Sequence, residues 1–320
     1  MAIPETEKRL PHLPVLYQEI ITALRPNSPG RYVDCTVGAG GHAAGILEHS
    51  SPDGQLLGLD LDPRALALAN LRLSPFGERV HLVQASYTTL PAQIHQLGWE
   101  NVQGIVFDLG VSSMQIDTPE RGFSFQEEGP LDMRFDPTQP LTAADVLNTW
   151  SERELADLLW QYGEEPQSRR IARAIVQDRP LHSTRDLAAL VASVAGGRKG
   201  HLHPATRTFQ ALRIVVNREL EAIAEFLPLA VEALAPGGRL AVISFHSLED
   251  RIVKQYFKRE SRDCICPPEQ PVCTCGHRAS VTEVNRHPIT ASEEEVQTNP
   301  RARSARLRIV EKENTGMVVA

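Results

Sequence analysis

Short apolar runs alternate with stretches of helical periodicity along the first third of the chain. The runs that predict strands are Arg31–Thr36, Gln55–Leu61, Val80–Ala85 and Gly104–Leu109, with a fifth at Arg239–Phe245. Between them, apolar residues recur at helical spacing, as at Ala43, Ile46 and Leu47. Pro63 stands where a helix after the second strand would begin. This alternation predicts a parallel sheet covered on both faces by helices, which is an α/β fold.

The fourth and fifth predicted strands are separated by about 130 residues, far more than a single crossover needs. Patterns typical of helices fill this length, at residues 143–162, 167–177, 183–195 and 206–234. We expect Ser183 or Thr184 to cap the third of these helices, and Gly196-Gly197 to end it. The chain is therefore predicted to contain a discontinuous α/β domain, residues 1–116 and 206–320, interrupted by a helical domain at residues 117–205.

The composition is that of an ordinary globular protein. Of the 320 residues, 42% are hydrophobic and 23% charged, which excludes a disordered chain or a disulfide scaffold. No apolar run reaches the roughly 18–20 residues that span a bilayer, and the first residues lack the pattern of a signal peptide. We therefore expect a cytoplasmic protein whose five cysteines are reduced.

Charge is distributed unevenly along the predicted helical domain. The net charge is -7, which argues against a protein that coats nucleic acid by bulk attraction. Residues 117–165 hold twelve acids against three arginines, whereas residues 166–213 hold nine cations against two acids. Two interpretations stay open, namely solvated helix faces and a local surface that grips a polyanion.

A glycine-rich segment joins the first predicted strand to the first helix. Residues 34–42 read Asp-Cys-Thr-Val-Gly-Ala-Gly-Gly-His, and the part from Gly38 matches the dinucleotide-binding fingerprint. Glycines at this place let backbone N–H groups approach a ligand at a helix N-terminus. Asp60 ends the second strand about twenty residues on, where a carboxylate accepts both hydroxyls of a ribose. The pattern favours a nucleoside-containing cofactor.

Further acidic residues favour a cationic cofactor. Asp34 precedes the glycine turn, where it would hold an ammonium group, although a role in capping the helix is the alternative. The fourth strand ends at Asp108, and the hydroxyls of Ser112 and Ser113 follow it at the edge where ligands bind in doubly wound folds. Carboxylates in this crevice suit S-adenosylmethionine better than a nicotinamide dinucleotide.

Seven segments resemble the bacterial small-subunit (16S) rRNA cytosine-N4 methyltransferases, the MraW or RsmH family. They are His12–Ile20, Asp34–His42, Asp108–Gln115, Arg121–Phe125, Gly129–Arg134, His203–Arg213 and Ile243–Asp250. The resemblance implies a class I S-adenosylmethionine-dependent methyltransferase with a Rossmann-like sheet and an inserted helical substrate-recognition domain. It also implies methylation of N4 of one cytidine in the decoding region of 16S rRNA, with the small ribosomal subunit as partner and neither DNA nor a membrane.

The resemblance also implies a set of site residues. The family's contacts with S-adenosylmethionine fall on Gly40, Gly41, His42, Asp60, Asp108 and Gln115, and a contact usually made by phenylalanine falls on Tyr87. The Asp/Asn-Pro-Pro-Tyr element of many amine methyltransferases is missing at the edge that begins with Asp108. We therefore take Asp108, with Ser112 or Ser113, as the candidate acceptors of hydrogen bonds from the target amine.

Candidate RNA contacts lie on both sides of the fifth strand. Arg198, Lys199, Arg207 and Arg213 are suited to phosphate groups. His246, together with Glu249, would contact a cytosine that has left its stack, or would simply neighbour a helix cap at Ser247.

Four cysteines form a C-x-C-x6-C-x-C cluster, at Cys264, Cys266, Cys273 and Cys275. Four thiolates hold structural zinc in many proteins, but C-x-C is tighter than the usual spacing, so we favour a flexible substrate loop without metal. Cys35 is expected to pack in the core. Two rival functions stay open, namely a nicotinamide-dependent oxidoreductase and a non-catalytic RNA-binding or ribosome-assembly factor.

Overall fold

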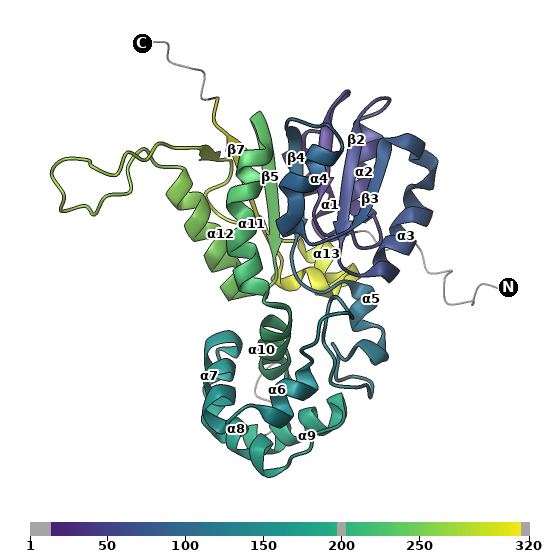
Figure 1. Cartoon of the computed structure of the whole chain (residues 1–320), viewed down its shortest axis with the longest axis vertical. Coiled ribbons are helices and arrows are strands. Elements are labelled where there is room, and N and C mark those ends of the chain that lie inside the picture. The colour runs from purple at the N-terminus through teal and green to yellow at the C-terminus, as the bar shows by residue number, and fades with distance from the viewer. Residues whose placement is uncertain (1–13, 197–202, 315–320) are drawn as a thin grey trace. The chain divides into compact units, whose positions relative to one another are not determined.

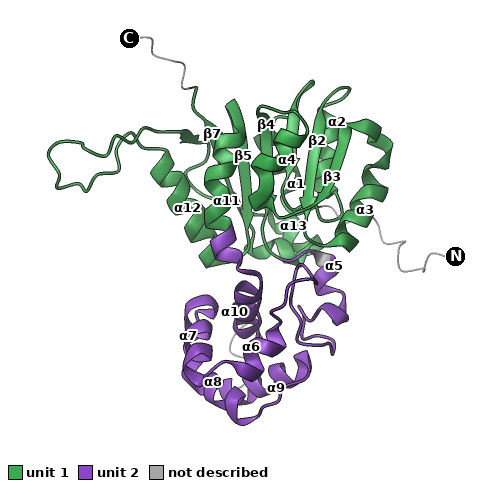
Figure 2. Ribbon diagram, viewed as in Figure 1, with its two compact units in different colours: residues 1–110, 223–320 green, residues 111–222 purple. Residues whose placement is uncertain are grey.

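The computed structural model describes residues 14–196 and 203–314, and divides the chain into two compact units (Figure 2). Unit 1 comprises residues 1–110 and 223–320, and unit 2 comprises residues 111–222. Unit 2 is therefore larger than the predicted domain at residues 117–205. The difference arises mainly because α10 (Thr206–Asn217) packs against α7 (Glu152–Gly163) and α6 (Ala143–Thr149). Its apolar face thus belongs to the helical core.

Unit 1 is built on a seven-stranded sheet whose strand order is β3-β2-β1-β4-β5-β7-β6. The first five strands are parallel neighbours, whereas β7 runs antiparallel to both β5 and β6. The strands are β1 (Arg31–Asp34), β2 (Gln55–Asp60), β3 (Val80–Gln84), β4 (Val102–Asp108), β5 (Leu234–Ser244), β6 (Val281–Glu283) and β7 (Arg306–Lys312). The five predicted strands are confirmed. The sequence patterns did not predict β6 and β7, which extend the parallel part of the sheet with antiparallel pairs.

Helices cover both faces of this sheet (Figure 1). One face packs against α1, α2 and α3 through a continuous apolar cluster, and Phe226 of α11 packs on Phe107 of the other face with ring centroids 4.6 Å apart. The helices of unit 1 are α1 (Tyr17–Leu24), α2 (Gly41–His49), α3 (Pro63–Leu73), α4 (Leu90–Gln96), α11 (Glu219–Ala233), α12 (Ser247–Glu260) and α13 (Glu293–Thr298). Short 3-10 segments are η2 (Ser74–Arg79), η3 (Tyr87–Thr89) and η5 (Pro300–Ser304).

Unit 2 is a group of helices around its own apolar core. Besides α6, α7 and α10 it contains α5 (Ser113–Ile116), η4 (Pro119–Arg121), α8 (Ser168–Gln177) and α9 (Thr184–Ala195). Ser183 is the N-cap of α9, as predicted, and Gly196 ends that helix in the left-handed region, while Gly197 lies outside the described residues.

Two predicted helices are each broken in the structure. The one expected at residues 143–162 is interrupted at Trp150, because Ser151 starts α7 with a capping box to Glu154. The one expected at residues 206–234 is interrupted at Arg218, which adopts a φ of 50° between α10 and α11. Within the described residues, no helix combines the length and the apolar character needed to cross a membrane.

Candidate functional site

The turn after β1 places a row of backbone N–H groups at the carboxyl edge of the sheet. Gly38 donates its N–H to Oδ2 of Asp60 at 2.9 Å, which ties this turn to the end of β2. Gly40 caps α2 with a φ of 77°, and a side chain there would also crowd Leu73 at 3.2 Å. The turn therefore requires glycine at position 40.

Asp60 is held in place by its own neighbourhood. Its Oδ1 accepts the N–H of Asp62 at 2.9 Å, and Asp62 in turn caps α3 by accepting the N–H of Arg64. Pro63 is the first residue of that helix, as predicted. Burial raises the pKa of Asp60, while the N–H groups of Asp62 and Gly38 act in the opposite direction. The carboxylate is thus oriented before any ligand arrives.

Asp34 and Asp108 end the neighbouring strands β1 and β4, and Thr36 connects them. Thr36 donates its N–H to Oδ1 of Asp34 at 3.2 Å, and its Oγ1 accepts the N–H of Asp108 at 3.0 Å. Burial raises the pKa of Asp34 to about 7, and the nearby charge of Asp60 adds to the effect. Burial also raises the pKa of Asp108 well above its usual range, with the charges of Asp34 and Glu249 contributing.

These three carboxyl groups form a site that suits a cation. Oδ1 of Asp108 is buried and has no hydrogen-bond partner among the described residues. Buried acids that repel one another are costly to ionise in the absence of a positive charge. A ligand that carries positive charge and hydroxyl groups would satisfy them, and S-adenosylmethionine carries a sulfonium, an ammonium and a ribose. The residues present therefore fit this cofactor.

His42 lies beside the carboxyl cluster in a neutral form. Burial, with the charge of Arg72, lowers its pKa to about 3. Its Nε2 is 3.8 Å from Oδ2 of Asp108, which is too long for a hydrogen bond, and its ring stacks on Tyr17 with centroids 6.4 Å apart. His42 and Gly41 form the first turn of α2, so a cofactor contact there would be made by their backbone.

Tyr87 follows β3 and forms an aromatic group with two phenylalanines. Its ring centroid lies 4.6 Å from that of Phe107 in β4 and 5.1 Å from that of Phe226 in α11, both with edge-to-face geometry. Tyr87 is half-buried. Such a ring is suited to stacking on a base.

Three candidate residues belong to unit 2. Ser112 and Gln115 bind each other, because Gln115 Oε1 accepts the N–H of Ser112 at 3.1 Å and Ser112 Oγ accepts the N–H of Gln115 at 3.2 Å. Ser113 begins α5. Ser112 and Gln115 thus sit in a fixed turn shortly after Asp108 in the chain.

The candidate RNA contacts differ in their exposure and in their partners within the protein. Arg207 is exposed in the first turn of α10, whereas Arg213 forms a bidentate pair with Glu219 at 2.8 and 2.9 Å. This pairing occupies the guanidinium of Arg213 and makes it a weaker candidate for a phosphate contact than Arg207. Arg198 and Lys199 lie outside the described residues.

His246 has a defined structural role. It is itself the N-cap of α12, rather than Ser247, and its Nδ1 accepts the N–H of Glu249 at 3.4 Å. The buried carboxylate of Glu249 accepts the N–H groups of Phe245 and His246 in return, and lies 3.0 Å from Nε2 of His246. The expected cap at Ser247 is therefore replaced by a cap at His246, one residue earlier.

The acidic and basic stretches of unit 2 partly neutralise each other. Arg173 lies 3.4 Å from Glu152, and Arg185 lies 3.5 Å from Glu128. Exposed pairs of this kind contribute little stability and exchange readily for other partners. These ion pairs therefore do not prevent Arg173 and Arg185 from contacting a polyanion.

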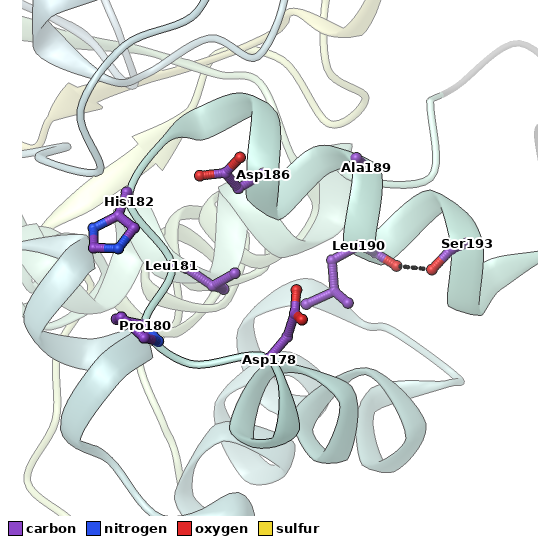
Figure 3. Close-up of a pocket in the computed structure, with 8 residues that line it drawn as sticks. All are labelled: Asp178, Pro180, Leu181, His182, Asp186, Ala189, Leu190 and Ser193. Carbon is purple, nitrogen blue, oxygen red and sulfur yellow. Dashed lines mark hydrogen bonds between the residues drawn. The ribbon is translucent and has the colours of Figure 1, made fainter.

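A shallow hollow of about 550 Å³ lies between the end of α8 and α9 (Figure 3). Its lining combines the apolar Leu181 and Leu190 with the carboxylates of Asp178 and Asp186, and includes neither arginine nor lysine. This hollow is unsuited to a phosphate group.

Three residues that the sequence reasoning passed over support the candidate site. Thr36 connects Asp34 to Asp108, Tyr17 stacks on His42, and Phe226 packs against Tyr87. Tyr17 lies in one of the segments that carry the family resemblance, and this position in the sequence could have indicated that it supports the site. Nothing in the local sequence around Phe226 indicates its partner.

Comparison with known proteins gives a consistent result. The model of the MraW methylase family matches residues 9–313. The chain is 55% identical over 302 residues to a protein of Dehalococcoides mccartyi named ribosomal RNA small subunit methyltransferase H, covering 94% of this chain and 86% of that one. It is 53% identical over 304 residues to the protein of the same name from Thermomicrobium roseum, covering 94% and 93%. A third, from Heliobacterium mobile, is 51% identical over 307 residues, covering 94% and 98%.

Proposed function

Because the chain belongs to the MraW methylase family, we propose that it methylates N4 of a cytidine in the decoding region of 16S rRNA with S-adenosylmethionine. The observation that carries the proposal is a pair of acids at the carboxyl edge of the sheet: Asp34 is buried, and Asp108 has a buried Oδ1 without a hydrogen-bond partner among the described residues. The named relatives supply the substrate class. The reaction would take place in the cytoplasm, where ribosomes are assembled.

Each part of the cofactor has a partner in unit 1. Asp60 would accept hydrogen bonds from the ribose hydroxyls, and Asp34 would pair with the ammonium group. The backbone of Gly38, Gly40 and Gly41 would pass along the methionine portion, and Tyr87 would stack on the adenine. When bound, S-adenosylmethionine supplies an electrophilic methyl group on a cationic sulfur.

The target amine needs help from the protein, because its lone pair is delocalised into the cytosine ring. Asp108 would accept a hydrogen bond from that amine, and its Oδ1, which has no hydrogen-bond partner among the described residues, supports this role. Accepting it aligns the nitrogen and frees the lone pair, and much of the acceleration then comes from positioning. Ser112 and Ser113 remain further candidate acceptors. Asp108 would also take up the proton that the product nitrogen releases.

The cysteine beside the acidic residues does not support carbon 5 as the methylated atom. Methylation at carbon 5 of cytosine requires a nucleophile, commonly a thiolate, that adds to carbon 6. Cys35 is the cysteine next to Asp34, and it is buried in the core as expected. Burial and the neighbouring Asp34 raise the pKa of the Cys35 thiol well above its usual value. It is therefore a poor nucleophile at neutral pH.

Cofactor binding is expected to weaken as the pH falls below 7. Since the pKa of Asp34 is about 7 in the unliganded protein, a cation bound beside it would favour the ionised form and lower that pKa. The affinity should therefore rise with pH and level off above about 7, with a loss of about tenfold per unit below it. Calorimetric titration with S-adenosylmethionine between pH 5.5 and 7.5 measures the slope. An Asp34→Asn variant with an unchanged slope would disprove this assignment.

Two arginines of α10 offer a matched pair for testing RNA contacts. Arg207→Ala is expected to weaken binding of small-subunit RNA and to lower the slope of log affinity against log salt by about 0.7, the value of one single-stranded phosphate contact. Arg213→Ala should instead lower the free energy of unfolding by about 3 kcal/mol, because it leaves the mostly buried Glu219 without its guanidinium partner. Filter binding at several salt concentrations measures the effect of Arg207→Ala on RNA affinity, and urea unfolding measures the effect of Arg213→Ala on stability. Equal salt slopes for Arg207→Ala and wild type would contradict the prediction.

Transfer of labelled methyl from S-adenosylmethionine to small-subunit RNA that lacks the modification tests the proposal. Naked RNA and assembled subunits are offered side by side, with NADH as a competitor for cofactor binding. We expect incorporation into RNA and no competition by NADH. Tight cofactor binding without transfer to either substrate would favour the non-catalytic assembly factor, and micromolar binding of NADH would favour the oxidoreductase.

A further inference from the structure

Residues 261–280 form a loop in unit 1 that joins α12 to β6 (Figure 1). None of its twenty residues is buried, so no apolar core determines its shape. The loop closes where Ser280 donates its N–H to the carbonyl of Glu260 at 2.9 Å. A segment of this length without a core needs some other constraint to hold one conformation.

The loop brings four sulfur atoms together. Sγ atoms of Cys264, Cys266, Cys273 and Cys275 all lie within 4.8 Å of one another. Those of Cys273 and Cys275 are 3.6 Å apart, and those of Cys275 and Cys264 are 3.9 Å apart. Four sulfurs bound to one zinc ion at about 2.3 Å in a tetrahedron are separated by about 3.8 Å. A disulfide would need about 2.05 Å.

Backbone amides surround these sulfurs. The N–H groups of Thr274 and Cys275 point to the sulfur of Cys266, and those of Ile265 and His277 point to the sulfur of Cys275. Amide donors of this kind stabilise negative charge on metal-bound thiolates and fix the orientation of the ligands. Each C-x-C segment thus supplies both ligands and donors.

The two C-x-C segments come together because the chain folds back between them. Gln270 donates its N–H to the carbonyl of Pro267 at 3.0 Å, and its side chain donates to Oγ1 of Thr274 at 2.7 Å. The first C-x-C therefore faces the second. The short spacing, which led us to favour a metal-free loop, does not prevent four sulfurs from meeting.

We propose that Cys264, Cys266, Cys273 and Cys275 bind one zinc ion, which fixes the conformation of the loop at residues 261–280. Zinc fits because it accepts four thiolates in a closed tetrahedral site and needs no redox change. The site is structural, since all four positions are taken by protein ligands. It is independent of the methyl-transfer reaction.

Metal analysis of the full chain, purified without chelator from cells supplied with both zinc and iron, tests the proposal. We expect about one zinc per chain, and a tetrahedral thiolate spectrum in the visible range after replacement by Co²⁺. Cys264→Ser and Cys275→Ser should each lose most of the zinc while keeping the circular dichroism of the folded protein, because their side chains are exposed. Thr274→Ser, within the same loop, and Cys35→Ala, in the core, should both retain it.

Four outcomes would overturn the proposal. They are a metal-free chain with four reactive loop thiols, a mass lower by four hydrogens that shows two disulfides, iron in place of zinc, and zinc that persists in both loop cysteine variants.

Discussion

An Asp108→Asn variant is expected to lose about 10²–10⁴-fold in kcat/KM for methyl transfer while remaining folded. The side chain lies partly exposed at the end of β4, and its buried Oδ1 has no hydrogen-bond partner among the described residues. Asparagine keeps the shape, but its amide is uncharged and cannot take up a proton from the product. The loss should therefore appear mainly in kcat, measured with saturating cofactor.

The same substitution should stabilise the unliganded protein at high pH. A folded-state pKa that is raised, as for Asp34 and Asp108, gives a contribution to stability that is present at low pH and lost as the pH rises through that pKa. Replacing Asp108 by a neutral residue reduces the stability that the folded protein loses when these acids ionise at high pH. The melting temperature of Asp108→Asn should accordingly exceed that of wild type at about pH 9 and approach it at about pH 5.

Asp53→Asn is a suitable control for both measurements, because Asp53 is exposed in the turn before β2. It should change neither activity nor melting temperature. Full activity of Asp108→Asn would remove Asp108 from the chemistry and leave the serines as candidates.

An Asp60→Asn variant is expected to bind S-adenosylmethionine about 10–100-fold more weakly, because hydrogen bonds to a charged group contribute about 1.5–3 kcal/mol. Asp60 also accepts the N–H groups of Gly38 and Asp62, so the substitution loosens the glycine turn as well. Calorimetric titration measures the change in Kd.

A second ligand separates the roles of the two acids. 5′-Methylthioadenosine has the ribose but lacks the amino-acid portion of the cofactor. Asp60→Asn should weaken both ligands by similar factors, whereas Asp34→Asn should weaken only S-adenosylmethionine. Similar losses for both ligands in both variants would contradict the assignment of Asp34 to the ammonium group.

Local patterns predicted much of the fold because strands, caps and turns depend on neighbouring residues. The five parallel strands, the cap at Ser183 and the start of α3 at Pro63 were all expected from the chain. The break before α7 was also predictable, since Ser151 and Glu154 have the spacing of a capping box. The break at Arg218 had no such signal, because the left-handed residue there is not a glycine.

The strand β7 was missed because its polar residues are stabilised at long range. Arg308 is buried within it and pairs with Asp250 of α12 at 2.6 Å. In the sequence, arginines at positions 306 and 308 indicate an exposed segment, and only the partner fifty-eight residues away explains the burial of Arg308. The same limit applies to Arg213, whose partner Glu219 lies beyond the break at Arg218.

The positions of the three acidic residues of the candidate site were predictable from the sequence. Asp34, Asp60 and Asp108 lie at the carboxyl ends of adjacent strands, as their positions in the sequence indicated. The capping role of His246 and the close approach of four cysteines depend on how the chain folds back, which spacing alone did not reveal.

We propose that the acidic residues at the carboxyl edge of the sheet in unit 1 direct a methyl group to the exocyclic amine of cytidine. The most direct test uses S-adenosylmethionine with a deuterated methyl group, small-subunit RNA that lacks the modification, and chromatography with mass spectrometry of the digested nucleosides. We predict that the label elutes as N4-methylcytidine, and that the Asp108→Asn enzyme yields far less of it. Label in 5-methylcytidine, or in any nucleoside other than cytidine, would contradict the account.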